Sequence, residues 1–174
     1  DQDETSGGRP VGGDIIGHTP DIWGAHYSTS SSTVQRDYDT FAESGSYDET
    51  FDEWGYVGPQ TAAAILLNYV PTDHRILDAA CGSGLTGSAM KALGFTRIDG
   101  IDISPRLLEI AERTGAYDRL ARVDMQQYPF PIADGAYDAL MFIGALTYFE
   151  TNQVLRELCR VVRHGGHVVF SQRD

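Results

Sequence analysis

An acid followed by closely spaced glycines is the pattern in this chain that is most typical of a ligand site. Asp78 ends an apolar run, and Gly82 and Gly84 follow it directly before a segment with helical spacing. Glycine lets the backbone approach a ligand closely, and the first turn of a helix presents free amide groups. We therefore expect a nucleotide-like ligand here. The candidate residues of this turn are Asp78, Ala80, Cys81, Gly82, Ser83 and Gly84.

The same glycines, together with Gly87, also satisfy the spacing of a dinucleotide-binding turn. A dehydrogenase that binds a nicotinamide or flavin cofactor is therefore the rival interpretation. Asp78 distinguishes the two ligands, because a carboxylate repels a pyrophosphate and attracts the cationic amino group of a methionine moiety. The acid favours the cationic ligand.

Two more acids follow the next two predicted strands. Asp102 ends the second strand, where its carboxylate can accept hydrogen bonds from both hydroxyls of a ribose while Ile103 lies against an adenine ring. Asp124 and Met125 follow the third strand. There the carboxylate can accept a hydrogen bond from the exocyclic amine of adenine, and a backbone amide can donate to a ring nitrogen. Asp99 lies inside the second strand, and we expect it to point away from the ligand.

Alternating strand and helix signals indicate the elements that must position these residues. Strands are expected over 75–80, 97–102, 120–123, 137–143 and 167–171, and helices over 59–69, 85–93, 105–114 and 151–162. Ser104 is the expected N-cap of the third helix, with Pro105 as its first residue. This alternation predicts an α/β fold with a doubly wound, mostly parallel sheet and helices on both faces. Because the sequence stops after the fifth strand, we expect the sheet to be truncated there.

Composition divides the chain into three segments. Residues 1–33 form an acidic leader rich in Gly and Ser, which we expect to be flexible. Residues 34–70 combine alternating aromatic and acidic residues with a helix. Residues 71–174 carry the ligand-binding core.

The overall charge limits the expected partners. The chain has a formal net charge of -12 and a single lysine, Lys91. Nucleic acids and anionic membranes are usually bound by clustered Lys and Arg, so neither is expected as a partner. Because the apolar runs are too short to span a bilayer, we expect a cytoplasmic protein.

Cysteine and histidine residues show no pattern that supports metal binding or covalent catalysis. Cys81 and Cys159 lack the spacing of a disulfide framework or a zinc site. We expect Cys81 to serve as a small side chain of the glycine turn and Cys159 to lie in the core. The five histidines have no metal-ligand spacing, so no metal site is expected. No catalytic acid or base can be assigned.

From about residue 59 onward the chain resembles the class I S-adenosylmethionine-dependent methyltransferase superfamily, whose sheet has seven strands. Residues 77–84 are similar to its first motif, Asp102 to its ribose acid, Asp124 with Met125 to its adenine site and residues 137–140 to its fourth strand. Residues 155–167 resemble the helix and Gly-Gly turn before strand five, and residues 77–87 and 142–146 look most like the methyltransferase-like branch. Ala80 stands where many members have the first of three glycines, a small change because alanine has the next-smallest side chain.

The resemblance implies S-adenosylmethionine as the cofactor and transfer of its methyl group to an O, N or C nucleophile of a small molecule. It adds Ile143 to the cofactor-binding residues and implies that Tyr38 and Tyr47 belong to a lid over the cofactor. Two alternatives remain open, a cofactor-binding module that acts through a protein partner and a protein methyltransferase. Amine-modifying nucleic-acid methyltransferases of this superfamily have Asp or Asn before Pro-Pro where this chain has Gly144 and Ala145, so methylation of nucleic-acid bases is not expected.

Overall fold

The fold is described by a computed structural model that covers residues 29–45, 47–49 and 55–172. Most of the leader expected over residues 1–33 lies outside the described residues. Its last part is helical, because helix α1 (Ser31–Glu43) begins before the expected boundary. The Ser30 side chain accepts a hydrogen bond from the Thr33 amide and so caps this helix. The boundary expected after residue 33 therefore lies within α1.

Within the described residues, five strands form one sheet in the order β3-β2-β1-β4-β5, and every neighbouring pair is parallel. The strands are β1 (Arg75–Ala79), β2 (Arg97–Asp102), β3 (Arg119–Arg122), β4 (Tyr137–Phe142) and β5 (Val162–Phe170). This arrangement confirms the predicted α/β class. The strand order reverses at β1, because the chain first builds outward through β2 and β3 and then returns to place β4 on the other side of β1. In such sheets, ligands bind beyond the carboxyl ends of the strands at the point of reversal.

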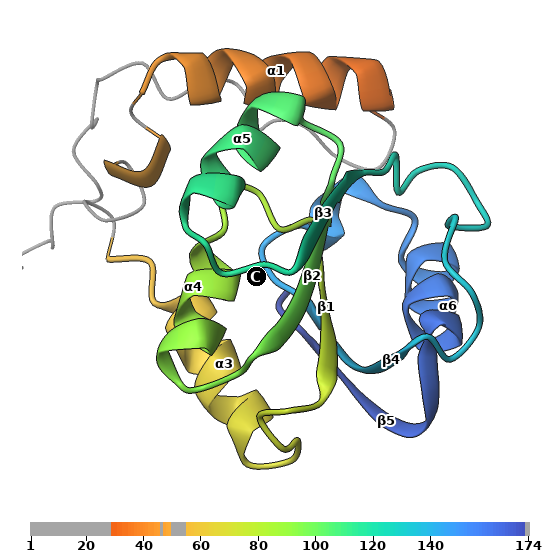
Figure 1. The fold of residues 1–174 in the computed structure, drawn as a ribbon. Helices are drawn as coiled ribbons and strands as arrows, with labels where there is room; N and C mark the ends of the chain where they lie inside the picture. The colour runs from red at the N-terminus through yellow and green to blue at the C-terminus, as the bar shows by residue number, and fades with distance from the viewer. Residues whose placement is uncertain (1–28, 46, 50–54, 173–174) are drawn as a thin grey trace, which may run out of the picture.

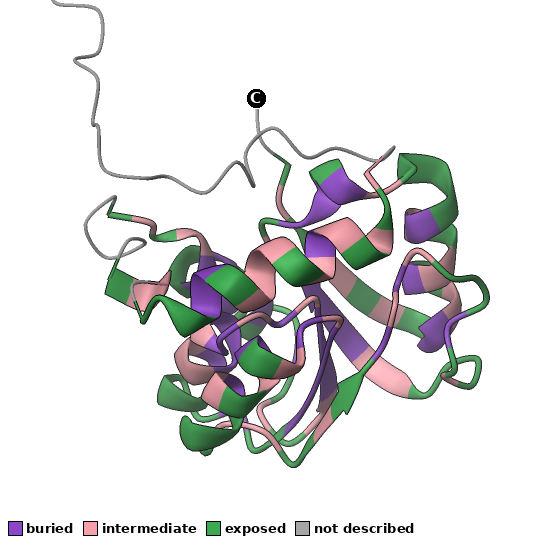
Figure 2. Cartoon of the chain, turned by 90° about the horizontal axis from the view of Figure 1, so that it is seen from above, coloured by how far each residue is buried: buried purple, intermediate pink, exposed green. Residues whose placement is uncertain are grey.

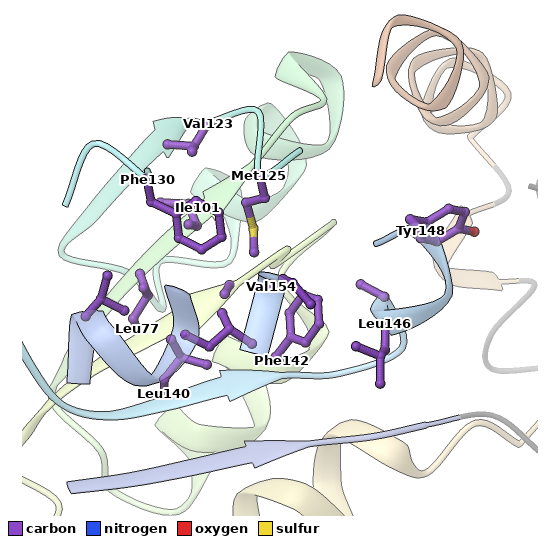
Figure 3. Packing of buried hydrophobic residues seen from close by; sticks show 14 of the residues in the cluster. Leu77, Ile101, Val123, Met125, Phe130, Leu140, Phe142, Leu146, Tyr148 and Val154 are labelled. Atoms are coloured by element: carbon purple, nitrogen blue, oxygen red, sulfur yellow. The ribbon is translucent and has the colours of Figure 1, made fainter. Parts of the chain in front are cut away.

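Helices cover both faces of the sheet (Figure 1). They are α3 (Gly58–Leu67), α4 (Leu85–Ala92), α5 (Pro105–Arg113) and α6 (Thr151–Val161), with the short 3-10 helix η2 (Leu146–Tyr148) after β4. Buried strand residues alternate between the faces, as the two-residue period of a strand requires. Ile76 and Met141 pack with α3 and α4, whereas Leu77 and Leu140 pack with α6. Figure 3 shows the second of these layers, with Leu77, Leu140 and Phe142 directed toward Val154 of α6.

The region around β5 differs from the expectation. A helix to residue 162 and a strand over 167–171 were expected, but α6 ends at Val161 and β5 runs from Val162 to Phe170. Val162 already pairs with Tyr137, and the register then shifts so that His167 pairs with Ala139. Gly165, which has a positive φ of 75°, lies between these two pairings. The Gly-Gly turn is therefore an irregularity within the strand and does not precede it.

The expected core position of Cys159 is wrong, because this side chain is exposed. The buried face of α6 consists of Val154, Leu158 and Val161, which follow the three-to-four-residue spacing of a helix. Cys159 comes one residue after Leu158 and therefore points away from the sheet. Figure 2 shows the same pattern across the molecule, with buried strands in the middle and exposed residues on the outer sides of the helices.

In the described part of the chain, no helix is long and apolar enough to cross a membrane.

Helix α1 lies above the end of the sheet and beside α5 (Figure 1). Asp39 of α1 accepts a 2.5 Å hydrogen bond from the hydroxyl of Ser104, the N-cap of α5. Glu43 of α1 forms an ion pair with Arg106 at 3.1 Å. As expected from the sequence, Ser104 also accepts a hydrogen bond from the Leu107 amide, at 3.0 Å. Ser104 therefore stabilises α5 and connects α1 to it.

Ser104→Ala is expected to lower the free energy of unfolding by about 2 kcal/mol, because it removes a buried helix cap and also the partner of Asp39. The matched control is Ser30→Ala, which removes the exposed cap of α1 and should cost about 1 kcal/mol or less. Urea denaturation of both variants measures the difference. Equal losses would show that the link to α1 adds nothing.

Candidate functional site

A pocket lies at the carboxyl ends of the strands, below α1. It encloses about 640 Å³ of empty space, part of it open to solvent. Its lining residues come from the loops after β1, β2, β3 and β4, from α1 and the segment that follows it, from α5, and from η2 and the residues around it. They are Ser31, Val34, Tyr38, Tyr47, Ala80, Gly82, Asp102, Ile103, Leu107, Val123, Asp124, Met125, Gln126, Ile143, Gly144, Ala145, Tyr148 and Phe149. The parallel topology brings these distant segments to one edge of the sheet.

Most of the residues predicted from the sequence lie on this pocket. The lining includes Ala80, Gly82, Asp102, Ile103, Asp124, Met125 and Ile143, and also the lid tyrosines Tyr38 and Tyr47. Asp78, Cys81, Ser83 and Gly84 are not among the lining residues. Asp78 is buried near the end of β1, and Cys81 is buried within the glycine loop, which comprises residues 80–84. Ser83 donates to Asp48, and Gly84 is the N-cap of α4.

Asp102 lies at the centre of the site and is only 8% exposed. Its Oδ2 accepts a hydrogen bond from the Gly82 amide at 2.8 Å, and its Oδ1 accepts one from the Ser104 amide at 2.9 Å. Burial raises the pKa of Asp102, whereas the two amides lower it by stabilising the charged form. Each carboxylate oxygen can accept a further hydrogen bond from a ligand in the pocket.

Two features favour glycine at position 82. Its φ of 55° is in the left-handed region, and a Cβ at this position would lie 3.2 Å from the Tyr47 hydroxyl oxygen. The segment that contains Tyr47 is held on the loop by a neighbouring contact, because the Ser83 hydroxyl donates to Asp48 at 2.6 Å. The segment around Tyr47 therefore packs directly on the glycine loop.

Three tyrosines form an aromatic cluster on the lid side of the pocket. The hydroxyls of Tyr38 and Tyr148 are hydrogen-bonded at 2.8 Å, and their rings meet edge to face with centroids 5.8 Å apart. The Tyr47 ring lies 6.3 Å from that of Tyr38. Burial raises the pKa of both Tyr38 and Tyr47 well above the ordinary value, so the two phenols remain neutral near neutral pH.

Sequence reasoning missed Tyr148 and Gln126. The Gln126 side chain donates to the carbonyls of Thr29 and Tyr148, at 3.1 and 3.0 Å, and so joins the loop after β3 to the start of α1 and to η2. The backbone amide of Gln126 donates to Asp124 Oδ1 at 3.0 Å. The position of Gln126 directly after Asp124 and Met125 was the available signal. For Tyr148 the signal was an aromatic residue shortly after the fourth strand.

Sequence reasoning also missed Tyr117, which lies beneath the glycine loop between α5 and β3. The Tyr117 hydroxyl donates to Asp78 Oδ2 at 2.7 Å and accepts a hydrogen bond from the Gly87 amide at 3.2 Å. Burial raises the pKa of Asp78 to about 7, and the hydrogen bond from Tyr117 opposes that rise. The first turn of α4 therefore has a carboxyl group and a phenol beneath it, where a dinucleotide-binding turn would face a phosphate.

Ala80 has a φ of 55° and is the described non-glycine residue with a positive φ. The left-handed region costs an L-residue roughly 1–2 kcal/mol. The main consequence of having alanine instead of glycine at position 80 is therefore backbone strain, and side-chain size is the smaller effect.

No candidate metal site is found among the described residues, which contain no group of three or more His, Cys, Asp or Glu side chains that could hold an ion.

Comparison with known proteins gives a consistent result. Residues 77–170 match the family described as "Methyltransferase domain". The chain is 36% identical to human methyltransferase-like protein 27 over 140 residues. The aligned region covers 78% of this chain and 56% of the human protein. It is also 36% identical over 113 residues to the malonyl-[acyl-carrier protein] O-methyltransferase of Buchnera aphidicola, covering 63% of this chain and 44% of that protein. The chain thus spans about half the length of these relatives.

The fold is shared with solved methyltransferases. A S-adenosylmethionine-dependent methyltransferase from Thermotoga maritima, described as a possible histamine N-methyltransferase, superposes with a TM-score of 0.60 and 19% identity. The match covers 76% of this chain and 58% of that one. At this identity the similarity shows that the fold is shared.

Ala80→Gly is expected to raise the free energy of unfolding by about 0.5–1 kcal/mol. Relief of the left-handed strain outweighs the greater freedom that glycine has in the unfolded chain. The control is Ala79→Gly, one residue earlier in β1, where the side chain is buried in an extended strand and its loss should destabilise by about 1 kcal/mol. Thermal and urea unfolding check both values. A loss of stability in Ala80→Gly would contradict the strain argument.

Proposed function

Because the chain belongs to the S-adenosylmethionine-dependent methyltransferases, whose methyltransferase domain it matches over residues 77–170, we propose that its pocket binds S-adenosylmethionine for methyl transfer to a small molecule. The accepting atom would be an oxygen, nitrogen or carbon nucleophile. The observation that carries the proposal is the position of Asp102 at the carboxyl end of β2, facing the pocket between the glycine loop and α5.

Asp102 is suited to hold the ribose of the cofactor. Its two oxygens are oriented by backbone amides of Gly82 and Ser104, so the carboxylate cannot rotate freely. A pair of vicinal hydroxyls is a complementary ligand, because each hydroxyl can donate one charge-assisted hydrogen bond to one carboxylate oxygen. The glycine loop lies beside Asp102, and its residues Ala80 and Gly82 line the pocket. Their backbone would contact the methionine part of the cofactor.

The adenine ring would lie between apolar side chains beyond Asp102. Ile103, Leu107 and Val123 line this part of the pocket together with Asp124 and Met125. Asp124 would accept a hydrogen bond from the exocyclic amine, and the Met125 amide would donate to a ring nitrogen. Apolar walls with a few convergent polar groups are the usual composition of a cofactor site.

The cofactor supplies the electrophilic methyl group when it is bound. The chain's contribution is to orient the nucleophile and to exclude water, which the aromatic cluster of Tyr38, Tyr47 and Tyr148 would do from above. The described lining residues include no His, Lys, Arg or Glu, so they offer no strong general base. The acceptor should therefore carry an atom that is nucleophilic without assistance.

The charge of the chain supports a neutral or cationic acceptor over nucleic acid. The formal net charge is -12, and Asp102 and Asp124 are the ionisable carboxylates of the described lining. An anionic polymer would be repelled by this surface. The name of the Buchnera relative, an O-methyltransferase of malonyl-[acyl-carrier protein], also supports an acceptor other than nucleic acid.

Asp102→Ala is expected to weaken binding of S-adenosylmethionine at least about tenfold, because two hydrogen bonds to a charged group are lost at roughly 1.5–3 kcal/mol each. Asp73→Ala, at an exposed position before β1, is the control and should leave affinity unchanged. Isothermal titration calorimetry measures both. Unchanged affinity in Asp102→Ala, or tight binding of NADH by the wild type, would contradict the proposed cofactor.

The acceptor class is tested by methyl transfer with the full-length protein on a panel of metabolites, proteins and nucleic acids at low and moderate salt. Transfer to a neutral or cationic metabolite is expected. Robust transfer to nucleic acid, with affinity that falls steeply as salt rises, would contradict the small-molecule acceptor. Transfer to protein alone would favour the protein methyltransferase.

A further inference from the structure

Tyr117 occupies a space that three glycines keep open beneath the cofactor loop. A Cβ at Gly84 would lie 3.2 Å from the Tyr117 ring and one at Gly100 would lie 2.9 Å from it, while one at Gly87 would overlap the phenol itself. Gly84 and Gly87 come from the start of α4, and Gly100 comes from the middle of β2. The glycines of the fingerprint therefore allow close packing of a tyrosine, as well as close approach of a ligand.

The Tyr117 hydroxyl connects two groups at the base of the loop. It donates to Asp78 Oδ2 at 2.7 Å and accepts from the amide of Gly87 at 3.2 Å. Asp78 is 1% exposed, so this hydrogen bond is not in competition with water. The Gly87 amide is one of the free donors in the first turn of α4, and Tyr117 satisfies it.

These contacts reverse the usual electrostatics of a glycine-rich helix start. A phosphate would find the Gly87 amide already bonded and a carboxylate nearby. A cationic ligand would be attracted by that carboxylate as long as it is ionised.

We propose that Tyr117 is a positioning residue of the cofactor site, whose hydroxyl stabilises the ionised Asp78 beneath the glycine loop and thereby sets the pH below which binding of the cationic cofactor is lost. The proposal rests on the proposed function, because it takes S-adenosylmethionine as the ligand. Asp78 and Tyr117 act through the loop, since neither lines the pocket.

The charged and titratable groups that face Asp78 set the direction of the effect. Burial, and to a smaller extent the negative charge of Asp102, raise the pKa of Asp78 to about 7, although the Tyr117 hydroxyl and the Gly87 amide both act to lower it. The Cys81 thiol also faces this site, and burial raises its pKa, so it remains neutral near neutral pH. Affinity for the cofactor is therefore expected above the midpoint of Asp78 and lost as the pH falls through it. Without the Tyr117 hydroxyl, that midpoint moves to higher pH.

The direct test is carboxyl ¹³C NMR of the ligand-free protein. In Tyr117→Phe the titration midpoint of Asp78 is expected to rise by about one pH unit, the equivalent of one hydrogen bond to a charged group. Calorimetry with S-adenosylmethionine between about pH 5.5 and 8.5 should show the acid limb of binding shifting in parallel, with affinity several-fold more reduced at pH 6.5 than at pH 8. Titration of the ligand's own amino group is common to all variants and cancels from the comparison.

Tyr137→Phe is the matched control. The Tyr137 hydroxyl also donates to a nearly buried carboxylate, that of Asp99 at 2.9 Å, but it does so away from the pocket. The same chemical change should therefore affect stability without moving the midpoint of Asp78 or the pH profile of binding.

An unshifted Asp78 midpoint in Tyr117→Phe, or an affinity loss equal at every pH, would overturn the role of Tyr117. Absence of binding by the wild type at every pH would instead contradict the proposed function, and the NMR midpoint would still report whether Tyr117 controls Asp78. If Tyr117→Phe does not fold, Asp78→Asn takes its place, because its amide oxygen can still accept from Tyr117 but cannot ionise. Weak, pH-flat binding supports the proposal, and a wild-type profile in Asp78→Asn overturns it.

Discussion

One buried carboxylate joins the parts of this protein that surround the pocket. Asp102 accepts hydrogen bonds from the Gly82 amide in the loop after β1 and from the Ser104 amide at the start of α5. A buried charge is costly unless it is hydrogen-bonded, so these amides are held where the carboxylate requires them. The glycine loop, the end of β2 and the start of α5 therefore behave as one unit. The other walls of the pocket are attached to this unit.

The segment before the sheet is attached through carboxylates of its own. Asp39 accepts from Ser104, and Asp48 accepts from Ser83, so both contacts fall within two residues of the groups that hold Asp102. The hydroxyls of Ser104 and Ser83 therefore hold two carboxylates close to the pocket by hydrogen bonds, without an ion pair to the sheet. Together with Asp102 and Asp124 on the pocket itself, these carboxylates suit a cofactor that carries a sulfonium and an ammonium group.

Glycines of this motif can make room for a ligand or for a side chain of the protein itself, and only the tertiary structure shows which. Glycine spacing shows that something must pass close to the backbone, but it does not show on which side. At Gly82 the approach is from the pocket, where the residue is part of the lining. At Gly87 it is from below, where the Tyr117 ring fills the space and its hydroxyl accepts from the amide. Gly82, Gly84 and Gly87 could therefore satisfy a dinucleotide fingerprint in a chain that belongs to another family.

The sequence by itself determined the parallel sheet, the acids at the ends of β2 and β3 and the N-cap Ser104, because strand periodicity, helix capping and the alternation of strands with helices are encoded by neighbouring residues. It did not determine where α1 begins, that β5 starts at Val162, or that Cys159 is exposed. It also did not reveal Tyr117, which lies 39 positions from its partner Asp78. Such contacts depend on which distant side chain fills a given space, and only the packed tertiary structure decides that.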